Sequence, residues 1–131
     1  MLMLYLFLLG RLLVGAYFIM SGLNHFKYLE MFTGYAQSKG VKMAKPMVIL
    51  SGLMMVLGGL GILLGVKVVC SILLLSLFLF TAAFKMHRFW EVSDHGARIG
   101  EEINFKKNLA LMGALLMLLA IPTPWVMSLF W

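Results

Sequence analysis

Four apolar stretches, each long enough to cross a lipid bilayer, dominate this sequence. They cover about residues 2–23, 46–65, 68–84 and 108–121 or slightly beyond. About 20 apolar residues in a helix span the roughly 30 Å of hydrocarbon in a membrane. A chain in lipid must also satisfy its backbone hydrogen bonds internally, which favours helices. The sequence therefore predicts an all-α integral membrane protein, a four-helix bundle that forms one transmembrane domain over residues 1–131.

The charged residues are few and are concentrated in two loops. Only 12% of the residues are charged and 63% are apolar. In a soluble domain, about 25% of the residues are charged and roughly 45–50% are apolar. All five acids and nine of the eleven bases lie in residues 24–45 and 85–107. Without a soluble basic surface, nucleic-acid binding is not expected.

The distribution of basic residues predicts the orientation in the membrane. Lys and Arg are enriched in cytoplasmic loops, so we expect both long loops to face the cytoplasm and both termini to lie outside the inner membrane. Trp125 and Trp131 then belong to the outer interface. We expect the first stretch to remain in the mature protein, because it lacks the basic start and the cleavage site of a signal peptide.

The first long loop carries a second, shorter helical pattern. Tyr28, Met31, Phe32 and Tyr35 recur at i, i+3, i+4 and i+7, which places them on one face of a helix. Gly40 is expected to end it. The pattern predicts a short amphipathic helix that lies in the headgroup layer at the cytoplasmic interface.

Small residues indicate where the membrane helices approach one another closely. Gly58, Gly61 and Gly65 share one face of the second stretch, and Ala110 and Ala114 form a small-x-x-x-small pair in the fourth. Helices in lipid associate through close backbone packing at such residues. We expect these five positions to pack the bundle; the alternative for the glycines is a grooved surface for a ligand.

Arg11 lies about nine residues into the first stretch and needs a compensating partner. A central arginine costs roughly 2.5–3.5 kcal/mol on insertion scales, and none of the four stretches contains an acid. It either extends to the outer headgroups or faces the bundle. In the bundle it either meets hydroxyls, amides, backbone carbonyls or ring faces of the chain, or anchors an acidic or carbonyl-bearing ligand or a partner's carboxylate. Gly15, Phe18, Gly22 and His25 follow it on the same helical face and are candidates to line such a ligand cleft.

Further polar residues gather where three of the stretches meet the cytoplasmic loops. They are Asn24, His25, His87, Lys106 and Asn108. Three readings are open: a rim that binds lipid headgroups, a quinone or substrate site, and a haem held between His25 and His87. The three scattered histidines do not have the spacing of a zinc site, so no metal is assigned.

The order and spacing of several segments resemble the DoxX family of small four-helix membrane proteins. These segments are GRLLVG at residues 10–15, SGLNHF at 21–26, FTGYA at 32–36, LGGL at 57–60 and NFKKNLALMG at 104–113. Family members often carry a glutamate shortly before the paired glycines, where this chain has Met54 and Met55. A role that the glutamate plays elsewhere is therefore not expected here.

The resemblance implies an association with membrane redox chemistry. Relatives include small membrane subunits of terminal oxidases and of thiosulfate:quinone oxidoreductase, and others are linked to oxidative-stress complexes and to amine-dehydrogenase maturation. We therefore expect a small subunit or partner of a quinone-linked redox complex. The alternative is a non-redox protein that binds lipid, transports, or helps assembly, and self-association is compatible with both. Catalysis by the chain alone is not expected. A general acid or base needs a titratable group held in a pocket, and only the histidines and acids near the long loops could supply one.

Overall fold

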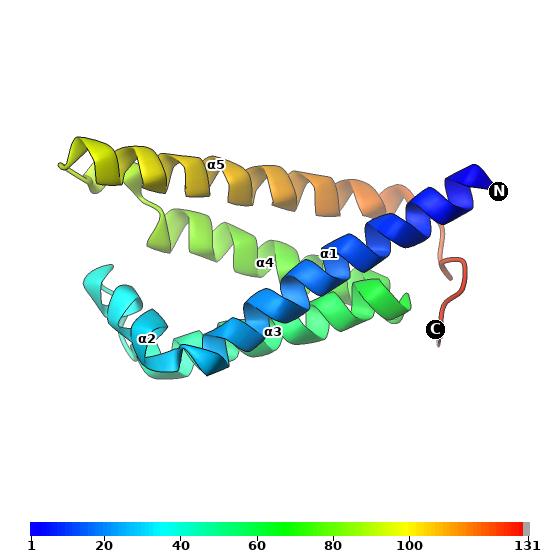
Figure 1. Ribbon diagram of the computed structural model, residues 1–131, viewed down its shortest axis with the longest axis horizontal. Helices are drawn as coiled ribbons and strands as arrows, with labels where there is room; N and C mark the ends of the chain where they lie inside the picture. The colour runs from blue at the N-terminus through cyan, green and yellow to red at the C-terminus, as the bar shows by residue number, and fades with distance from the viewer. Residues whose placement is uncertain (130–131) are drawn as a thin grey trace.

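The computed structural model describes residues 1–129 and consists of helices joined by short turns. Its elements are α1 (Leu2–Lys27), α2 (Leu29–Ser38), α3 (Ala44–Leu64), α4 (Val68–Met86), η1 (Phe89–Glu91), α5 (His95–Met117) and η2 (Leu118–Ala120). Helices α1, α3, α4 and α5 are each long and apolar enough to cross a membrane. The predicted all-α membrane bundle of four spanning helices is confirmed (Figure 1).

The helix that contains the predicted fourth span extends beyond it toward the N-terminus. Helix α5 begins at His95 and not near residue 108. The side chain of Asp94 caps its first turn and accepts a hydrogen bond from the backbone N–H of Ala97 at 2.9 Å, as preferred N-cap residues do. Hydropathy detects the lipid-embedded part of a helix, so it missed the first three turns, which are rich in charged residues.

The short helix in the first long loop is present as α2, and Gly40 follows its end with a φ of +76°. Its predicted apolar face is divided between two environments. Tyr28 and Met31 are exposed, whereas Phe32 and Tyr35 are half-buried and contact residues of α1 and α5. Only part of that face is free to meet lipid headgroups, and the interfacial position remains a prediction.

Helix α1 lies along α3, α3 contacts α4, and α4 contacts α5. Figure 1 shows the described chain ends at one end of the molecule and α2 with the α4–α5 connection at the other. At the end with the termini, Ile62 and Leu75 share a core with Leu115 and Trp125. Trp125 is therefore buried within the protein, its position at the outer interface remains a prediction, and Trp131 falls outside the described residues.

Glycines bring the backbones of α1 and α3 together. A Cβ atom on Gly22 would lie 2.7 Å from the carbonyl oxygen of Gly52, and one on Gly15 would lie 2.9 Å from that of Gly59. Real Cβ atoms essentially never approach a neighbour this closely. This crossing is the close backbone contact that membrane helices need for stable association.

The small residues singled out from the sequence have different surroundings. Gly58 and Gly61 face Leu75 and Ser71 of α4, where they allow α3 and α4 to approach. Gly65 ends α3 with a φ of +71°, a backbone conformation that suits glycine.

Ala110 and Ala114 lie on the exposed side of α5. The expectation that these two alanines pack the bundle was wrong for contacts within this chain. The buried residues of α5 are Asn108 and Leu115 instead.

Candidate functional site

The guanidinium group of Arg11 is buried at the end of the bundle that carries the termini. Its Nε donates to the carbonyl of Ile62 at 3.2 Å, and its two terminal nitrogens donate to the carbonyls of Leu63 at 2.8 Å and Val126 at 2.5 Å. Arg11 is only 5% exposed, so it does not extend to the headgroups. The inward orientation follows from the cost of a charge in lipid.

These bonds complete the C-terminal end of α3. The last four carbonyls of a helix have no partner within it. Arg11 satisfies two of them, the backbone N–H of Leu129 donates to Leu64 at 3.0 Å, and the hydroxyl of Ser128 donates to Gly65 at 2.5 Å. Arg11 and the C-terminal segment together cap this helix.

The predicted ligand cleft beside Arg11 is wrong. Its nitrogens contact the chain's own carbonyls, and its guanidinium carbon lies 5.8 Å and 5.9 Å from the ring centres of Phe7 and Trp125. Gly15 and Gly22, expected to continue the cleft, are covered by α3. The arginine is therefore a structural residue that joins α1, α3 and the C-terminal segment.

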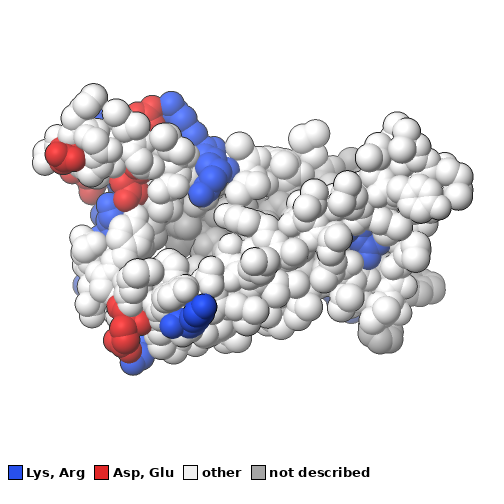
Figure 2. Space-filling view, in the orientation of Figure 1, with Lys and Arg blue, Asp and Glu red and all other residues white. Residues whose placement is uncertain are grey.

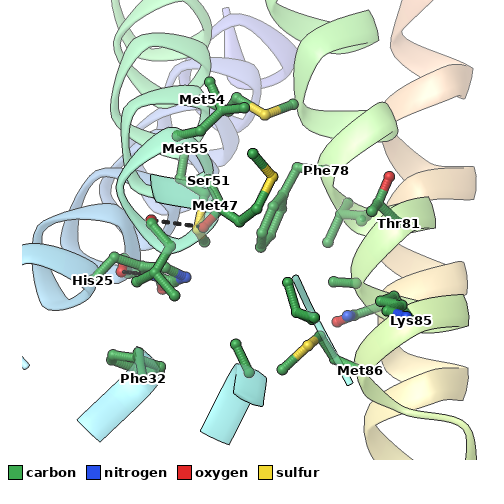
Figure 3. Close-up of a pocket in the computed structure, with 18 of the residues that line it drawn as sticks. His25, Phe32, Met47, Ser51, Met54, Met55, Phe78, Thr81, Lys85 and Met86 are labelled. Atoms are coloured by element: carbon green, nitrogen blue, oxygen red, sulfur yellow. Dashed lines mark hydrogen bonds between the residues drawn. The ribbon is translucent and has the colours of Figure 1, made fainter. Parts of the chain in front are cut away.

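A large cavity lies near the opposite end of the bundle, where the charged loops are. Its volume is about 860 Å³. Figure 2 shows the surface hollowed between α5 and α1, with most of the visible charged side chains gathered near that end. Figure 3 shows side chains of α1, α2, α3 and α4 around it. Its apolar wall consists of Phe18, Phe32, Met47, Met54, Met55, Phe78 and Met86.

Four residues that line the cavity are exposed at the surface. They form two pairs, Leu50 of α3 with Leu77 of α4 and Tyr17 of α1 with Lys107 of α5. These two pairs are the exposed edges of the cavity.

His25 presents a flat ring to this cavity. Its Nδ1 donates to the carbonyl of Ser21 at 2.8 Å, because a carbonyl oxygen can only accept. The imidazole stacks on Phe32 with ring centres 4.7 Å apart and planes 5° from parallel. Phe78 meets it edge-on at 6.2 Å. Aromatic contacts of this kind suit a planar ligand.

Glu101 joins three elements beside the cavity. Its carboxylate accepts a hydrogen bond from the Tyr35 hydroxyl at 2.7 Å and one from His87 Nδ1 at 2.6 Å, and it pairs with Lys39 at 3.3 Å. The Glu101 side chain is only 14% exposed. Burial raises the pKa of Tyr35, and the hydrogen bond and charge of Glu101 raise it further. Tyr35 and His87 also line the cavity, so this cluster forms its polar boundary.

The structure brings most of the expected polar residues together. Five of the candidate residues from the sequence line the cavity, namely the apolar Phe18 and the polar Asn24, His25, His87 and Asn108. Lys106 does not: it forms an ion pair with Glu102 on the exposed side of α5. The next residue, Lys107, lines the cavity in its place, because adjacent helical positions point about 100° apart.

Sequence reasoning missed Glu101 and the methionine wall. Glu101 and Tyr35 form a hydrogen bond although they lie 66 positions apart in the chain, and no local sequence pattern indicates such a pair. Met54 and Met55 both line the cavity. Their flexible thioethers fit apolar ligands of irregular shape.

Metal ligands do not cluster in the part of the chain that the structure describes: no three His, Cys, Asp or Glu side chains there could hold an ion together. His25 and His87, considered as haem ligands, do line the same cavity. Each already uses its Nδ1 in a hydrogen bond, so Nε2 is the remaining ring nitrogen.

Comparison with known proteins adds one match. Residues 6–88 match the model of a family described as DoxX. No curated protein and no solved structure matches the chain. The matched region covers more than half of the chain and includes His25 and His87, whereas Glu101 and Asn108 lie beyond it.

Proposed function

The chain belongs to the DoxX family of membrane proteins, and on that basis we propose that it is a small subunit of a quinone-linked redox complex that holds a quinone in its cavity. The observation that carries this proposal is the cavity itself. It combines an aromatic and methionine wall with polar groups from His25, His87 and Asn108. Small-molecule sites in proteins have this combination and typical volumes of about 300–1,000 Å³.

The chemistry of the cavity suits the two parts of a quinone. A planar head group can lie against the stacked rings of His25 and Phe32, and an isoprenoid tail can follow Met47 and Met54 to the exposed edge at Leu50. That edge faces the acyl chains in which quinones dissolve. The ligand therefore need not pass through water.

A redox partner is part of the proposal because of what the cavity side chains can do. The histidine, tyrosine and asparagine side chains of the cavity form hydrogen bonds, and histidine also takes up and releases protons, but none of them carries electrons. Oxidation or reduction of a quinone also requires an electron acceptor or donor. We assign that role to a partner subunit in the same membrane.

The test is to fill the cavity with a larger side chain. Ala82→Phe places a ring in the cavity wall of α4. Forcing a ligand against added bulk costs about 1–3 kcal/mol, which corresponds to roughly tenfold or more in affinity. We expect gently purified Ala82→Phe to retain about a tenth or less of the quinone that the unmodified protein retains, measured by solvent extraction and chromatography.

Ala114→Phe is the matched control, because Ala114 lies on the exposed side of α5 away from the cavity. It should retain the full quinone content. Equal quinone content in both variants, or none in the unmodified protein, would contradict the proposal.

A second candidate function is supported by the lysines of the cavity. Lys42, Lys85 and Lys107 all line it, and lysines near the membrane surface attract anionic headgroups. A non-redox lipid-binding, transport or assembly-helper protein would use such a site. Extraction of stoichiometric anionic phospholipid in place of quinone, lost in Ala82→Phe, would favour this alternative.

The orientation in the inner membrane is tested by cysteine labelling. In a Cys70→Ser background, we place a cysteine at the exposed positions Ser93 or Lys67, which lie in the α4–α5 connection and the α3–α4 turn. The excess of Lys and Arg in the long loops predicts that Ser93→Cys faces the cytoplasm. An impermeant reagent should label Lys67→Cys in intact cells and Ser93→Cys only after permeabilisation. The reverse pattern would overturn the orientation.

A further inference from the structure

Both histidines line the cavity, and both use their Nδ1 atom in a hydrogen bond. His25 donates from Nδ1 to the Ser21 carbonyl, which fixes the hydrogen on that nitrogen. In the neutral imidazole the other nitrogen is then an acceptor. The Nε2 atom of His25 can therefore accept a hydrogen bond but cannot donate one.

Glu101 imposes the same arrangement on His87. An ionised carboxylate has acceptor oxygens only. Its Oε2 lies 2.6 Å from His87 Nδ1, while Tyr35 and Lys39 supply hydrogens to Oε1. His87 thus donates from Nδ1, and in the neutral imidazole its Nε2 is the remaining acceptor. Glu101 does not line the cavity, so it acts as a positioning residue behind His87.

We propose that the cavity selects the reduced, dihydroxy form of a quinone, with one hydroxyl group donating to His25 and the other to His87. The inference rests on the proposed function and names the form of the ligand. A quinone has two carbonyl oxygens that only accept, so it leaves both imidazole acceptors unpaired. A quinol has two hydroxyl groups that donate.

The other polar groups of the cavity do not discriminate in this way. The lysines Lys42, Lys85 and Lys107 carry only N–H donors, which can bind the oxygen atoms of either form, and the amides and hydroxyls of the cavity can both donate and accept, so they can pair with either form. The preference for quinol therefore comes from the histidines and from the groups that fix their hydrogens. A hydrogen bond between neutral groups contributes about 0.5–1.5 kcal/mol net, so two of them predict roughly tenfold tighter binding of the quinol.

The experiment compares a decyl benzoquinol with the corresponding quinone by equilibrium dialysis against the purified protein in detergent, without oxygen. We expect the quinol to bind about tenfold more tightly. Glu101→Gln offers an amide N–H to His87 Nδ1, which moves the imidazole hydrogen to Nε2. This variant should lower the quinol-to-quinone affinity ratio, whereas a merely structural loss would weaken both ligands alike.

His25→Phe provides a second variant that keeps a ring on Phe32 and removes one acceptor. It should also lower the ratio. Equal binding of the two forms by the unmodified protein, tighter binding of the quinone, or a ratio unchanged in both variants would overturn the inference while leaving the quinone site in place. Failure of both forms to bind would overturn the proposed function itself.

Discussion

Gly22→Ala is expected to destabilise the protein by about 1–3 kcal/mol, the usual cost of adding a methyl group to a tightly packed contact. The new Cβ atom would lie 2.7 Å from the carbonyl oxygen of Gly52 and 3.0 Å from the Cβ of Met55. A backbone carbonyl cannot rotate away as a side chain does, so α1 and α3 must separate. Alanine gains at most about 1 kcal/mol over glycine through helix propensity, and the clash therefore dominates.

The measurement is thermal unfolding in a mild detergent. Gly113→Ala is the control, because Gly113 is also helical but has nothing within 4 Å of the position of an added Cβ. That variant should be as stable as the unmodified protein or slightly more stable. Unfolding of both variants at the same temperature would show that α1 and α3 do not cross as closely as described.

Arg11→Leu is expected to destabilise the bundle by about 2 kcal/mol or more. Removal of the guanidinium leaves the carbonyls of Ile62, Leu63 and Val126 without their donor, and each buried unpaired group costs about 1–3 kcal/mol. Removal of the buried charge also removes its unfavourable contribution of roughly 2.5–3.5 kcal/mol, which offsets part of this loss of stability. We expect the three carbonyls to outweigh that gain, because the α3 end and the C-terminal segment lose a common attachment.

Arg11→Lys tests the geometry of the attachment. A single ammonium group keeps the charge but cannot reproduce the planar arrangement of donors, so its stability should fall close to that of Arg11→Leu. Lys67→Leu removes an exposed cation at the same end of the bundle and should have little effect. Protease cleavage within residues 122–129 should rise in the Arg11 variants only. Unchanged unfolding and cleavage in Arg11→Leu would reject the capping role.

The membrane fold could be predicted from the sequence because lipid leaves the chain few alternatives. Each apolar stretch has to be a helix, and the cost of a charge in lipid favours an inward position for Arg11. Backbone carbonyls were among the predicted partners of Arg11, but the particular carbonyls of Ile62 and Leu63 were not, since the orphan carbonyls at a helix end are identical for every sequence. The start of α5 was missed for a related reason: its polar first turns carry no membrane signal, and Asp94 is a weak local indicator.

The candidate site was predictable only in its parts. Asn24, His25, His87 and Asn108 were recognised as polar residues at the same side of the membrane, and they do share one cavity. Their common cavity depends on how far the ends of α1 and α4 diverge, which periodicity does not specify. Glu101 was overlooked because its significance comes from distant contacts with Tyr35 and Lys39.

The two exposed edges of the cavity differ in character. The edge between α3 and α4 carries Leu50 and Leu77, whereas the edge between α1 and α5 carries Tyr17 and Lys107. A neighbouring subunit that covered the more polar edge would leave the apolar edge open to the bilayer. Ligand turnover would then not require the subunits to separate, and a used molecule could return to the membrane pool while the complex stayed assembled.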